Sequence, residues 1–331
     1  MAIFNVTSET INQAANCLKK GGLVAFPTET VYGLGADARN AEAVKRIFAA
    51  KKRPENHPLI VHLANIEQLS DWAKDIPDAA FKLAQHFCPA PLALILKKRP
   101  EVDYAVTGGQ DTIALRVPNH PVALELLRKF GDGIAAPSAN RFCRISPTRA
   151  QHVADELGDD VEMILDGGAC QIGVESTIID LSGSVPMLLR FGQITRRELE
   201  AVLQTQILIP DAIVQSNVRT AGMMEVHYAP TTKAVRCENA VLNEFIKTES
   251  QKIGVLACGS KISATKNCKI FTLPSDPVAY AQGLYATLRE LDGLKMDLIL
   301  VEQPPQNEAW QAINDRLSKA THYVESIIID D

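Results

Sequence analysis

The sequence predicts a two-domain α/β protein whose larger part is built on a mixed sheet. At 331 residues the chain exceeds the usual length of one domain. Short apolar runs alternate with amphipathic segments along it, which is the pattern of helices packed on a sheet. Several apolar runs lie close enough along the chain to pair antiparallel, so we expect a mixed sheet rather than a purely parallel one.

The mixed sheet and its helices are expected within the first 200 residues. Residues 7–22 combine typical helix-start residues with a terminal glycine pair, and 40–51 forms a second helix with an asparagine cap. Residues 23–26 are predicted as a buried strand that ends at a proline. Further strands are predicted over 59–63, 92–96, 112–117, 134–136, 177–181 and 187–190, and further helices over 81–88 and 121–130.

A second, smaller domain is predicted after a stretch of weak periodicity. This stretch, 204–232, is longer than most ordered loops, and such loops are usually lids or linkers. We therefore divide the chain into a first domain over 1–203, a linker or lid over 204–232, and a second domain over 233–331. The run Leu298–Val301 is typical of a parallel sheet, so the second domain is expected to be a small Rossmann-like α/β unit. Its other strands are predicted from 234 and over 253–257, and its helices over 276–291 and 310–320.

The composition excludes several classes of protein. Apolar residues make up 46% and charged residues 22%, as in ordinary soluble globular proteins. The net charge of −5 argues against a general nucleic-acid coat protein, which would be basic. Seven scattered cysteines without a C-x-x-C pair are expected as reduced thiols. With no signal-peptide pattern and no apolar run approaching ~18 residues, the chain is expected to be cytoplasmic and not membrane-bound.

Two short segments, about ninety residues apart, point to a pocket for a polyanion. Lys51 and Arg53 supply fixed positive charge at the end of a helix. Ser138 and Asn140 supply small hydroxyl and amide groups in a turn. A nucleoside triphosphate needs both, because charge neutralises phosphates and short donors orient them. The alternative is that the basic pair is solvated and only complements the helix dipole.

Further candidates lie at predicted strand ends. Arg116 and Arg190 could each hold a carboxylate or phosphate. His62 sits on an apolar strand, where a buried core histidine is the alternative to a ligand-binding one. Gly33 and Gly35 lack the remaining residues of a dinucleotide or Walker fingerprint, so we expect a turn with close backbone approach. The histidines and acidic residues show no metal-ligand spacing, so no metal held by protein ligands is predicted.

Taken together, these motifs resemble the YrdC-type threonylcarbamoyl-AMP synthases in their long, two-domain form. The resemblance implies a YrdC-like twisted mixed sheet with helices, joined by a long linker to a Rossmann-like domain. Its motifs in the first 200 residues are Pro27–Gly35, Lys51-x-Arg53-Pro54, His57–His62, Pro137–Asn140, Ser146–Thr148 and Glu175–Thr177. Those of the long form are Gly222-Met223, His227–Pro230 and Asp315–Leu317.

The resemblance implies a nucleotidyltransferase that makes L-threonylcarbamoyladenylate from L-threonine, bicarbonate and ATP and releases pyrophosphate. The product would feed threonylcarbamoyladenosine formation next to the tRNA anticodon, by way of a tRNA threonylcarbamoyl transferase complex. Mg²⁺ is expected with ATP, held mainly by the triphosphate. No stable nucleic-acid binding is expected, and the chain is expected to be a monomer or weak dimer.

The same resemblance assigns residues to two sites. Lys51, Arg53, Ser138 and Asn140 are implied as the catalytic residues that hold the nucleotide phosphates. Further nucleotide contacts are implied for His57, Thr112, Ser146, Arg190, His227 and Tyr228, the last two reaching over the nucleotide from the linker. The implied L-threonine site consists of Thr30, His62, Arg116 and Ser176.

The sequence departs from the family pattern at several positions, and three other functions are alternatives to the one implied. Cys143 stands where a glycine is expected, and it would be strained if that position requires a positive φ. Residues 88–93 and the missing proline before Gly222 also depart from the pattern. One alternative is the related enzyme of hydrogenase maturation that uses carbamoyl phosphate, whose zinc motifs are not visible here. The others are a non-catalytic RNA-binding module and a nucleotidyltransferase for another amino acid.

Overall fold

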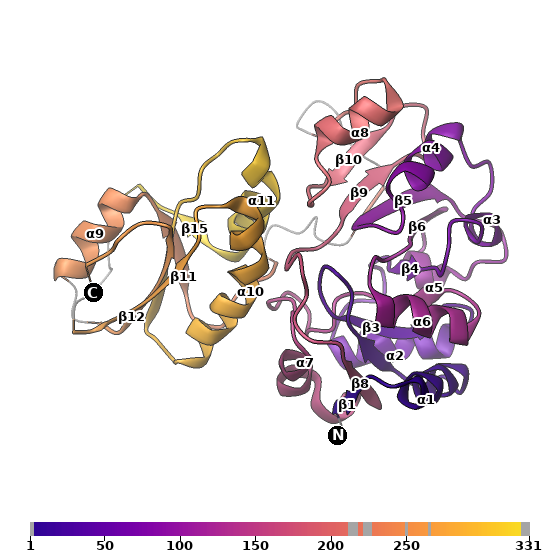
Figure 1. Ribbon diagram of the computed structural model, residues 1–331, viewed down its shortest axis with the longest axis horizontal. Coiled ribbons are helices and arrows are strands. Elements are labelled where there is room, and N and C mark those ends of the chain that lie inside the picture. The colour runs from indigo at the N-terminus through magenta and orange to yellow at the C-terminus, as the bar shows by residue number, and fades with distance from the viewer. Residues whose placement is uncertain (1–2, 211–217, 221–226, 249–250, 264–265, 326–331) are drawn as a thin grey trace. The chain divides into compact units, whose positions relative to one another are not determined.

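The structure, a computed structural model, describes residues 3–210, 218–220, 227–248, 251–263 and 266–325. The chain forms two compact units, coloured from indigo to orange-yellow along the sequence in Figure 1. One is Met1–Phe142 with Ser146–Met223, and the other is Cys143–Ile145 with Met224–Asp331. The predicted linker includes 211–217 and 221–226, which lie outside the described residues. Within the described ranges, no helix is long and apolar enough to cross a membrane.

The first unit is built on a ten-stranded mixed sheet. Its strands are β1 (Ile3–Asn5), β2 (Val24–Phe26), β3 (Gly33–Asp37), β4 (Ile60–His62), β5 (Leu92–Lys97), β6 (Thr112–Arg116), β7 (Ile134–Ala135), β8 (Met163–Asp166), β9 (Thr177–Asp180) and β10 (Met187–Arg190). Their order across the sheet is β1-β8-β2-β3-β7-β4-β6-β5-β9-β10. The pair β4–β6 is parallel and β5–β6 antiparallel, so the predicted mixed sheet is confirmed.

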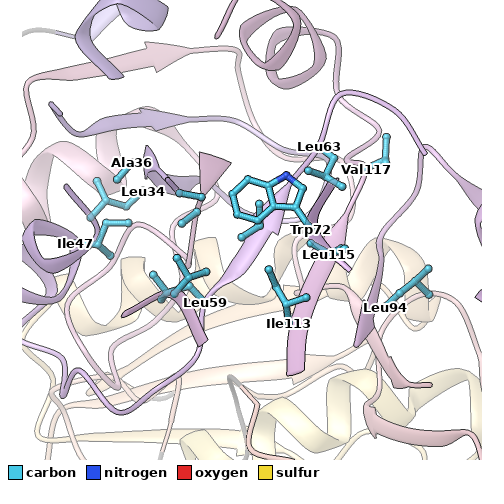
Figure 2. Close-up of a cluster of buried hydrophobic side chains, with 14 of the residues drawn as sticks. Leu34, Ala36, Ile47, Leu59, Leu63, Trp72, Leu94, Ile113, Leu115 and Val117 are labelled. Atoms are coloured by element: carbon cyan, nitrogen blue, oxygen red, sulfur yellow. The ribbon is translucent and has the colours of Figure 1, made fainter. Parts of the chain in front are cut away.

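Helices cover both faces of this sheet, and the strand residues alternate between two apolar clusters. The helices are α1 (Ser8–Lys19), α2 (Ala41–Lys51), α3 (Leu69–Trp72), α4 (Asp78–Phe87), α5 (Tyr104–Thr107), α6 (Pro121–Phe130), α7 (Ala150–Leu157), the 3-10 turn η1 (Gly158–Asp160) and α8 (Arg196–Leu203). Val24 and Phe26 pack with α1 and α6, which lie side by side. Ala25 points to the other cluster, which contains Ile47 of α2 and Trp72 (Figure 2). Burial on both faces explains why the strands read as nearly continuous apolar runs.

Several sequence predictions require correction. Gly33 and Gly35 lie in β3 and not in a turn. The predicted close approach is present, because a Cβ added at Gly35 would come within 2.8 Å of the Phe26 ring. The predicted helix over 81–88 begins earlier, at Asp78. The sequence analysis also did not identify β1, β8, α7 and α8.

The second unit is a five-stranded parallel sheet in the order β13-β12-β14-β11-β15, which confirms the predicted Rossmann-like α/β unit. Its elements are β11 (Ala234–Cys237), α9 (Asn239–Thr248), β12 (Ile253–Cys258), β13 (Cys268–Leu273), α10 (Pro277–Gly293), β14 (Leu298–Glu302), η2 (Glu308–Trp310), α11 (Gln311–Ala320) and β15 (His322–Tyr323). Val255 and Leu300 form one apolar face with Leu242 of α9. On the other face, a Cβ added at Gly254 would clash with Leu291, so glycine lets α10 pack closely on the sheet.

Three residues in the middle of the chain belong to the second unit. Cys143–Ile145 are flanked on both sides by residues of the first unit. Arg144 forms an ion pair of 3.0 Å with Asp292, and the Cys143 carbonyl accepts a hydrogen bond of 3.0 Å from the Ala229 amide. Cys143 has a φ of 63°, so the positive φ considered from the sequence is confirmed.

Candidate active site

Four predicted site residues gather at one edge of the large sheet. His62 ends β4 and Arg116 ends β6, and the two are register partners in this parallel pair. Ser176 directly precedes β9, and Arg190 ends β10, which is antiparallel to β9. Strand direction brings these ends together, since β9 is parallel to β5 and β5 is antiparallel to β6.

Arg116 is the centre of a buried polar cluster at this edge. Its Nη2 atom lies 2.7 Å from Oε1 of Glu29 and donates a hydrogen bond of 3.0 Å to the Thr30 hydroxyl. The Arg116 and Glu29 side chains are only 4% and 3% exposed. Thr30 is fully buried, and its hydroxyl also lies 2.9 Å from that of Thr28. The structure therefore places two of the predicted threonine-binding residues, Thr30 and Arg116, in direct contact.

His62 completes this cluster as a neutral imidazole. The side chain is 2% exposed and meets the Phe26 ring edge-on, with 6.1 Å between ring centroids. Burial lowers the pKa of His62 to about 3, and the positive charge of Arg116 adds to the effect. No hydrogen-bond partner for Nδ1 of His62 is present in the described part of the chain. Such an atom can still accept or donate a bond to a ligand.

Ser176, the fourth residue of the predicted threonine site, is held by Arg190. The guanidinium of Arg190 donates to the Ser176 carbonyl oxygen at 2.9 Å and to the Ser176 hydroxyl at 3.0 Å. Directly before it, the Glu175 carboxylate accepts a hydrogen bond of 2.6 Å from the hydroxyl of Ser146. The predicted nucleotide residue Arg190 thus contacts the predicted threonine residue Ser176. The predicted nucleotide residue Ser146 contacts Glu175, the sequence neighbour of Ser176.

The two predicted phosphate-binding segments meet through Lys51. Its ammonium donates to the carbonyl oxygen of Ser138 at 2.5 Å and to that of Asn140 at a shorter distance. The Phe142 amide returns a hydrogen bond of 2.8 Å to the Lys51 carbonyl. Lys51 is 1% exposed, which excludes the alternative of a solvated helix-end lysine. Lys51 therefore fixes the shape of the turn that carries Ser138 and Asn140.

Two other predicted nucleotide residues lie close to this turn. Arg53 is 8% exposed and donates to the Pro58 carbonyl at 3.1 Å. His57 is half-buried, and its ring lies 5.3 Å from that of Phe142. Burial, followed by the charges of Arg53 and Arg219, lowers the pKa of His57. This side chain is therefore expected to be neutral at pH 7.

Three predicted nucleotide residues, Thr112, His227 and Tyr228, lie in parts of the fold other than the sheet edge that carries the Arg116 cluster. Thr112 begins β6, about 13 Å along the strand from Arg116. It lines a cavity of about 570 Å³ together with Lys74, Lys97 and Lys98.

His227 and Tyr228 lie in the second unit, where the His227 amide donates to the Lys319 carbonyl. Tyr228 stacks on Tyr285, with ring centroids 5.8 Å apart, and lies 5.4 Å from the Arg316 guanidinium.

Sequence reasoning missed two residues beside the Arg116 cluster, Glu29 and His120. His120 precedes α6 and is 7% exposed. Its pKa is lowered overall, because the effect of burial outweighs the opposite effect of the negative charge of Glu29. Glu29 was quoted as part of a motif, but a glutamate between two threonines gives no local sign that it is buried. Its contact with Arg116 bridges 87 positions of sequence and forms only in the folded chain.

The site presents buried donors, a buried ion pair and a neutral histidine within one region of the sheet edge. Such an arrangement can hold a small zwitterion beside a phosphorylated ligand, since guanidinium groups bind carboxylates and phosphates in the same planar geometry. Among the described residues, no group of three or more His, Cys, Asp or Glu side chains could hold a metal ion.

Comparison with known families and proteins supports this interpretation. Residues 16–192 match the Sua5/YciO/YrdC family model, whose description is "Telomere recombination". Residues 194–321 match the model described as "Threonylcarbamoyl-AMP synthase, C-terminal domain". A threonylcarbamoyl-AMP synthase of Pyrococcus abyssi is 43% identical, over 95% of this chain and 94% of the relative. The Bacillus subtilis protein of the same name is 41% identical, over 94% of this chain and 92% of the relative.

A solved structure of a relative matches this one over nearly its whole length. The crystal structure of Pyrococcus abyssi Sua5 complexed with L-threonine superimposes with a TM-score of 0.90 at 41% identity. The match covers 98% of this chain and 100% of the other. The predicted YrdC-like sheet and Rossmann-like second unit are thereby confirmed. The chain belongs to the Sua5/YrdC family of threonylcarbamoyl-AMP synthases.

Proposed function

We propose that this protein makes L-threonylcarbamoyladenylate from L-threonine, bicarbonate and ATP, with release of pyrophosphate, as the first step of threonylcarbamoyladenosine formation in tRNA. The observation that carries the proposal is the buried cluster of Arg116, Thr30 and His62, in a chain that matches a threonine-bound relative over almost all its length. Arg116 would bind the carboxylate of threonine, and Thr30 and Ser176 would offer hydroxyls to its polar groups.

In the proposed reaction the threonine amine takes up the carbon of bicarbonate and becomes an N-carboxylate. That carboxylate attacks the α-phosphorus of ATP, and pyrophosphate leaves. No covalent bond to the enzyme is needed, so catalysis would come from positioning and from charge neutralisation. Lys51, Arg53 and Arg190 would supply positive charge for the phosphates, and Lys51 also holds the turn with Ser138 and Asn140.

Mg²⁺ is proposed to accompany ATP, with most of its ligands supplied by the triphosphate. The hydroxyl of Ser146 and the carboxylate of Glu175 are buried oxygens only 2.6 Å apart, which fits the one or two protein ligands that such an ion needs. These two side chains would hold it. When bound, the ion would neutralise part of the triphosphate charge.

The decisive experiment is pyrophosphate release by the purified protein with L-threonine and bicarbonate added singly and together. Release that requires both is the expected result. Release with threonine alone in bicarbonate-depleted buffer would instead indicate ordinary amino-acid adenylation. Turnover only with carbamoyl phosphate would indicate the hydrogenase-type reaction, and no turnover with salt-sensitive tRNA binding would indicate an RNA-binding module.

The product is proposed to pass to a tRNA threonylcarbamoyl transferase complex, because a mixed carboxylic–phosphoric anhydride is hydrolysed readily and needs prompt use. The 204–232 segment is proposed to act as a lid that limits this hydrolysis. Truncation after residue 203 would then impair turnover, and a fully active fragment would contradict the lid. A cytoplasmic location, a monomer or weak dimer, and no stable nucleic-acid binding stay predictions.

A further inference from the structure

Glu29 is a buried carboxylate that the proposed roles do not use. The residue is 2% exposed and lies within the Arg116 cluster, with its Oε1 atom 2.7 Å from Nη2 of Arg116. Despite this short distance, the contact lacks hydrogen-bond geometry. Both carboxylate oxygens of Glu29 and Nε of Arg116 are buried without a hydrogen-bond partner among the described residues.

Such a pair is costly for the protein on its own. Burying two charges is stabilising only when good geometry and further hydrogen bonds compensate for lost hydration. Here three strongly polar atoms, two of Glu29 and one of Arg116, have no such compensation in the described chain. Buried polar atoms without partners are rare, and at a functional site they indicate where a ligand binds.

A bound α-amino acid would satisfy both members of the pair. Its carboxylate and ammonium groups are attached to the same carbon, so they present a negative and a positive charge side by side. Arg116 can bind the carboxylate while Glu29 accepts hydrogen bonds from the ammonium. Each buried charge then exchanges one partner for another, and the pocket remains electrically balanced.

We propose that Glu29 binds the ammonium group of L-threonine and removes its proton, so that a neutral amine attacks bicarbonate. This assignment rests on the proposed function. The ammonium transfers one proton to the Glu29 carboxylate, and the nitrogen lone pair forms a bond to the bicarbonate carbon. The carbon–hydroxyl bond breaks, the leaving hydroxide takes a second proton from nitrogen, and water departs. The proton on Glu29 returns to solvent before the next turnover.

The other charged or titratable groups around Glu29 are Arg116, two histidines and two cysteines. A guanidinium group such as that of Arg116 does not act as a base, and His62 is a weak base because burial lowers its pKa to about 3. Burial also lowers the pKa of His120. The thiols of Cys88 and Cys170, which feel the charge of Glu29, have pKa values raised by burial to about 11 and about 12. Glu29, with Oε1 2.7 Å from Nη2 of Arg116, is the group placed to meet the ammonium when Arg116 holds the carboxylate.

The test compares Glu29→Gln with wild type for two ligands, L-threonine and the analogue in which a hydroxyl replaces the α-amino group. The variant keeps the size of the side chain and loses its charge. Calorimetry is expected to show at least about tenfold weaker threonine binding, as for a lost charged hydrogen bond, and an analogue affinity within about twofold. Equal losses for both ligands would overturn the proposal, because they would show that Glu29 only orients Arg116.

Turnover gives a second readout. In Glu29→Gln the rate is expected to rise about tenfold per pH unit below the pKa of the amine, because deprotonation then depends on solvent. Glu29→Asp should recover part of the rate. An unchanged pH profile in a folded Glu29→Gln variant would exclude the proton-transfer role. Asp180→Asn is the matched control, since it changes a buried carboxylate that bonds Ser182 outside the site, and its ratio of threonine to analogue affinity should equal that of wild type.

Threonine binding by the wild-type protein distinguishes a failure of this proposal from a failure of the proposed function. If wild-type protein binds threonine but releases no pyrophosphate with all substrates present, the proposed function fails while the ammonium contact is still measured by calorimetry.

Discussion

Replacing Lys51 by methionine tests whether the turn of Ser138 and Asn140 depends on this one side chain. Methionine retains most of the apolar stem and removes the ammonium. In wild type that ammonium donates to the carbonyl oxygens of both turn residues within a site where Lys51 is 1% exposed. The variant therefore removes two charge-assisted hydrogen bonds from the interior while preserving most of the packing.

The expected loss of stability follows from these two bonds. A hydrogen bond to a charged group contributes about 1.5–3 kcal/mol, so two give roughly 3–6 kcal/mol. Part of this is offset because the variant no longer buries an ammonium, and we expect a net loss of about 3 kcal/mol in the free energy of unfolding. For a unit of this size, that corresponds to a fall in Tm of roughly 6–12 °C. Threonine-dependent pyrophosphate release should fall at least about tenfold.

The assay can report on the first unit alone. Trp72 is fully buried in the first unit, and Trp310 belongs to the second. In a Trp310→Phe background, urea unfolding followed by tryptophan fluorescence therefore reports on the first unit. The control is Lys45→Met on the same helix, whose ion pair with Glu42 is exposed and should contribute little to stability.

Two outcomes would refute this reasoning. If Lys51→Met is as stable as the Lys45→Met control, the two carbonyl contacts do not shape the turn. If the folded variant turns over at the wild-type rate, Lys51 has no role in neutralising phosphate charge.

Three further predictions concern single positions in both units. Cys143→Gly should raise the free energy of unfolding of the second unit by about 1 kcal/mol in urea titration, since glycine adopts the observed φ of 63° without strain; no gain would show that Cys143 is unstrained. Burial lowers the pKa of His62 in the folded chain to about 3. The neutral side chain therefore contributes fully to the free energy of unfolding above pH 6.5, and this contribution falls by about 1.4 kcal/mol for each pH unit below that. His62→Phe should flatten stability between pH 6.5 and about 4, and an unchanged slope would mean that His62 is protonated in the folded state. Glu302 accepts hydrogen bonds from the Asn239 amide, the Cys258 backbone and the Ser260 hydroxyl, so Glu302→Gln should cost about 2 kcal/mol; wild-type stability in thermal unfolding would rule this out.

The regular elements that the sequence predicted well have strong local signals. The helix α2 has an asparagine cap whose side chain accepts from two backbone amides, and α6 begins at a proline and ends at a glycine with positive φ. By contrast, β1 and β8 were missed, although they are as short as the predicted strands β2 and β9. These two strands pair with each other, with Ile3 opposite Ile164, a contact between distant segments that no local pattern shows.

Candidate site residues could be identified from the sequence, but their burial and contacts could not be predicted. The motifs that carry Lys51, Asn140 and Ser176 could be recognised because small polar and basic residues stand out between apolar runs. The burial of Lys51 could not be predicted, because its two acceptors lie 87 and 89 positions away. For the same reason no local pattern indicates that Glu29 contacts Arg116, which lies 87 positions away.

By itself, then, the sequence determined the family, the alternation of helices and strands, and the chemical groups available for a threonine and nucleotide site. These depend on local composition and on the order of motifs, which a linear chain retains. Only the tertiary structure decided which groups meet: that Lys51 holds a turn through carbonyl oxygens, that Glu29 opposes Arg116, and that Cys143–Ile145 belong to the second unit. Strand order and burial set these contacts, because the energy of a charge depends on the partners and solvent around it rather than on its neighbours in sequence.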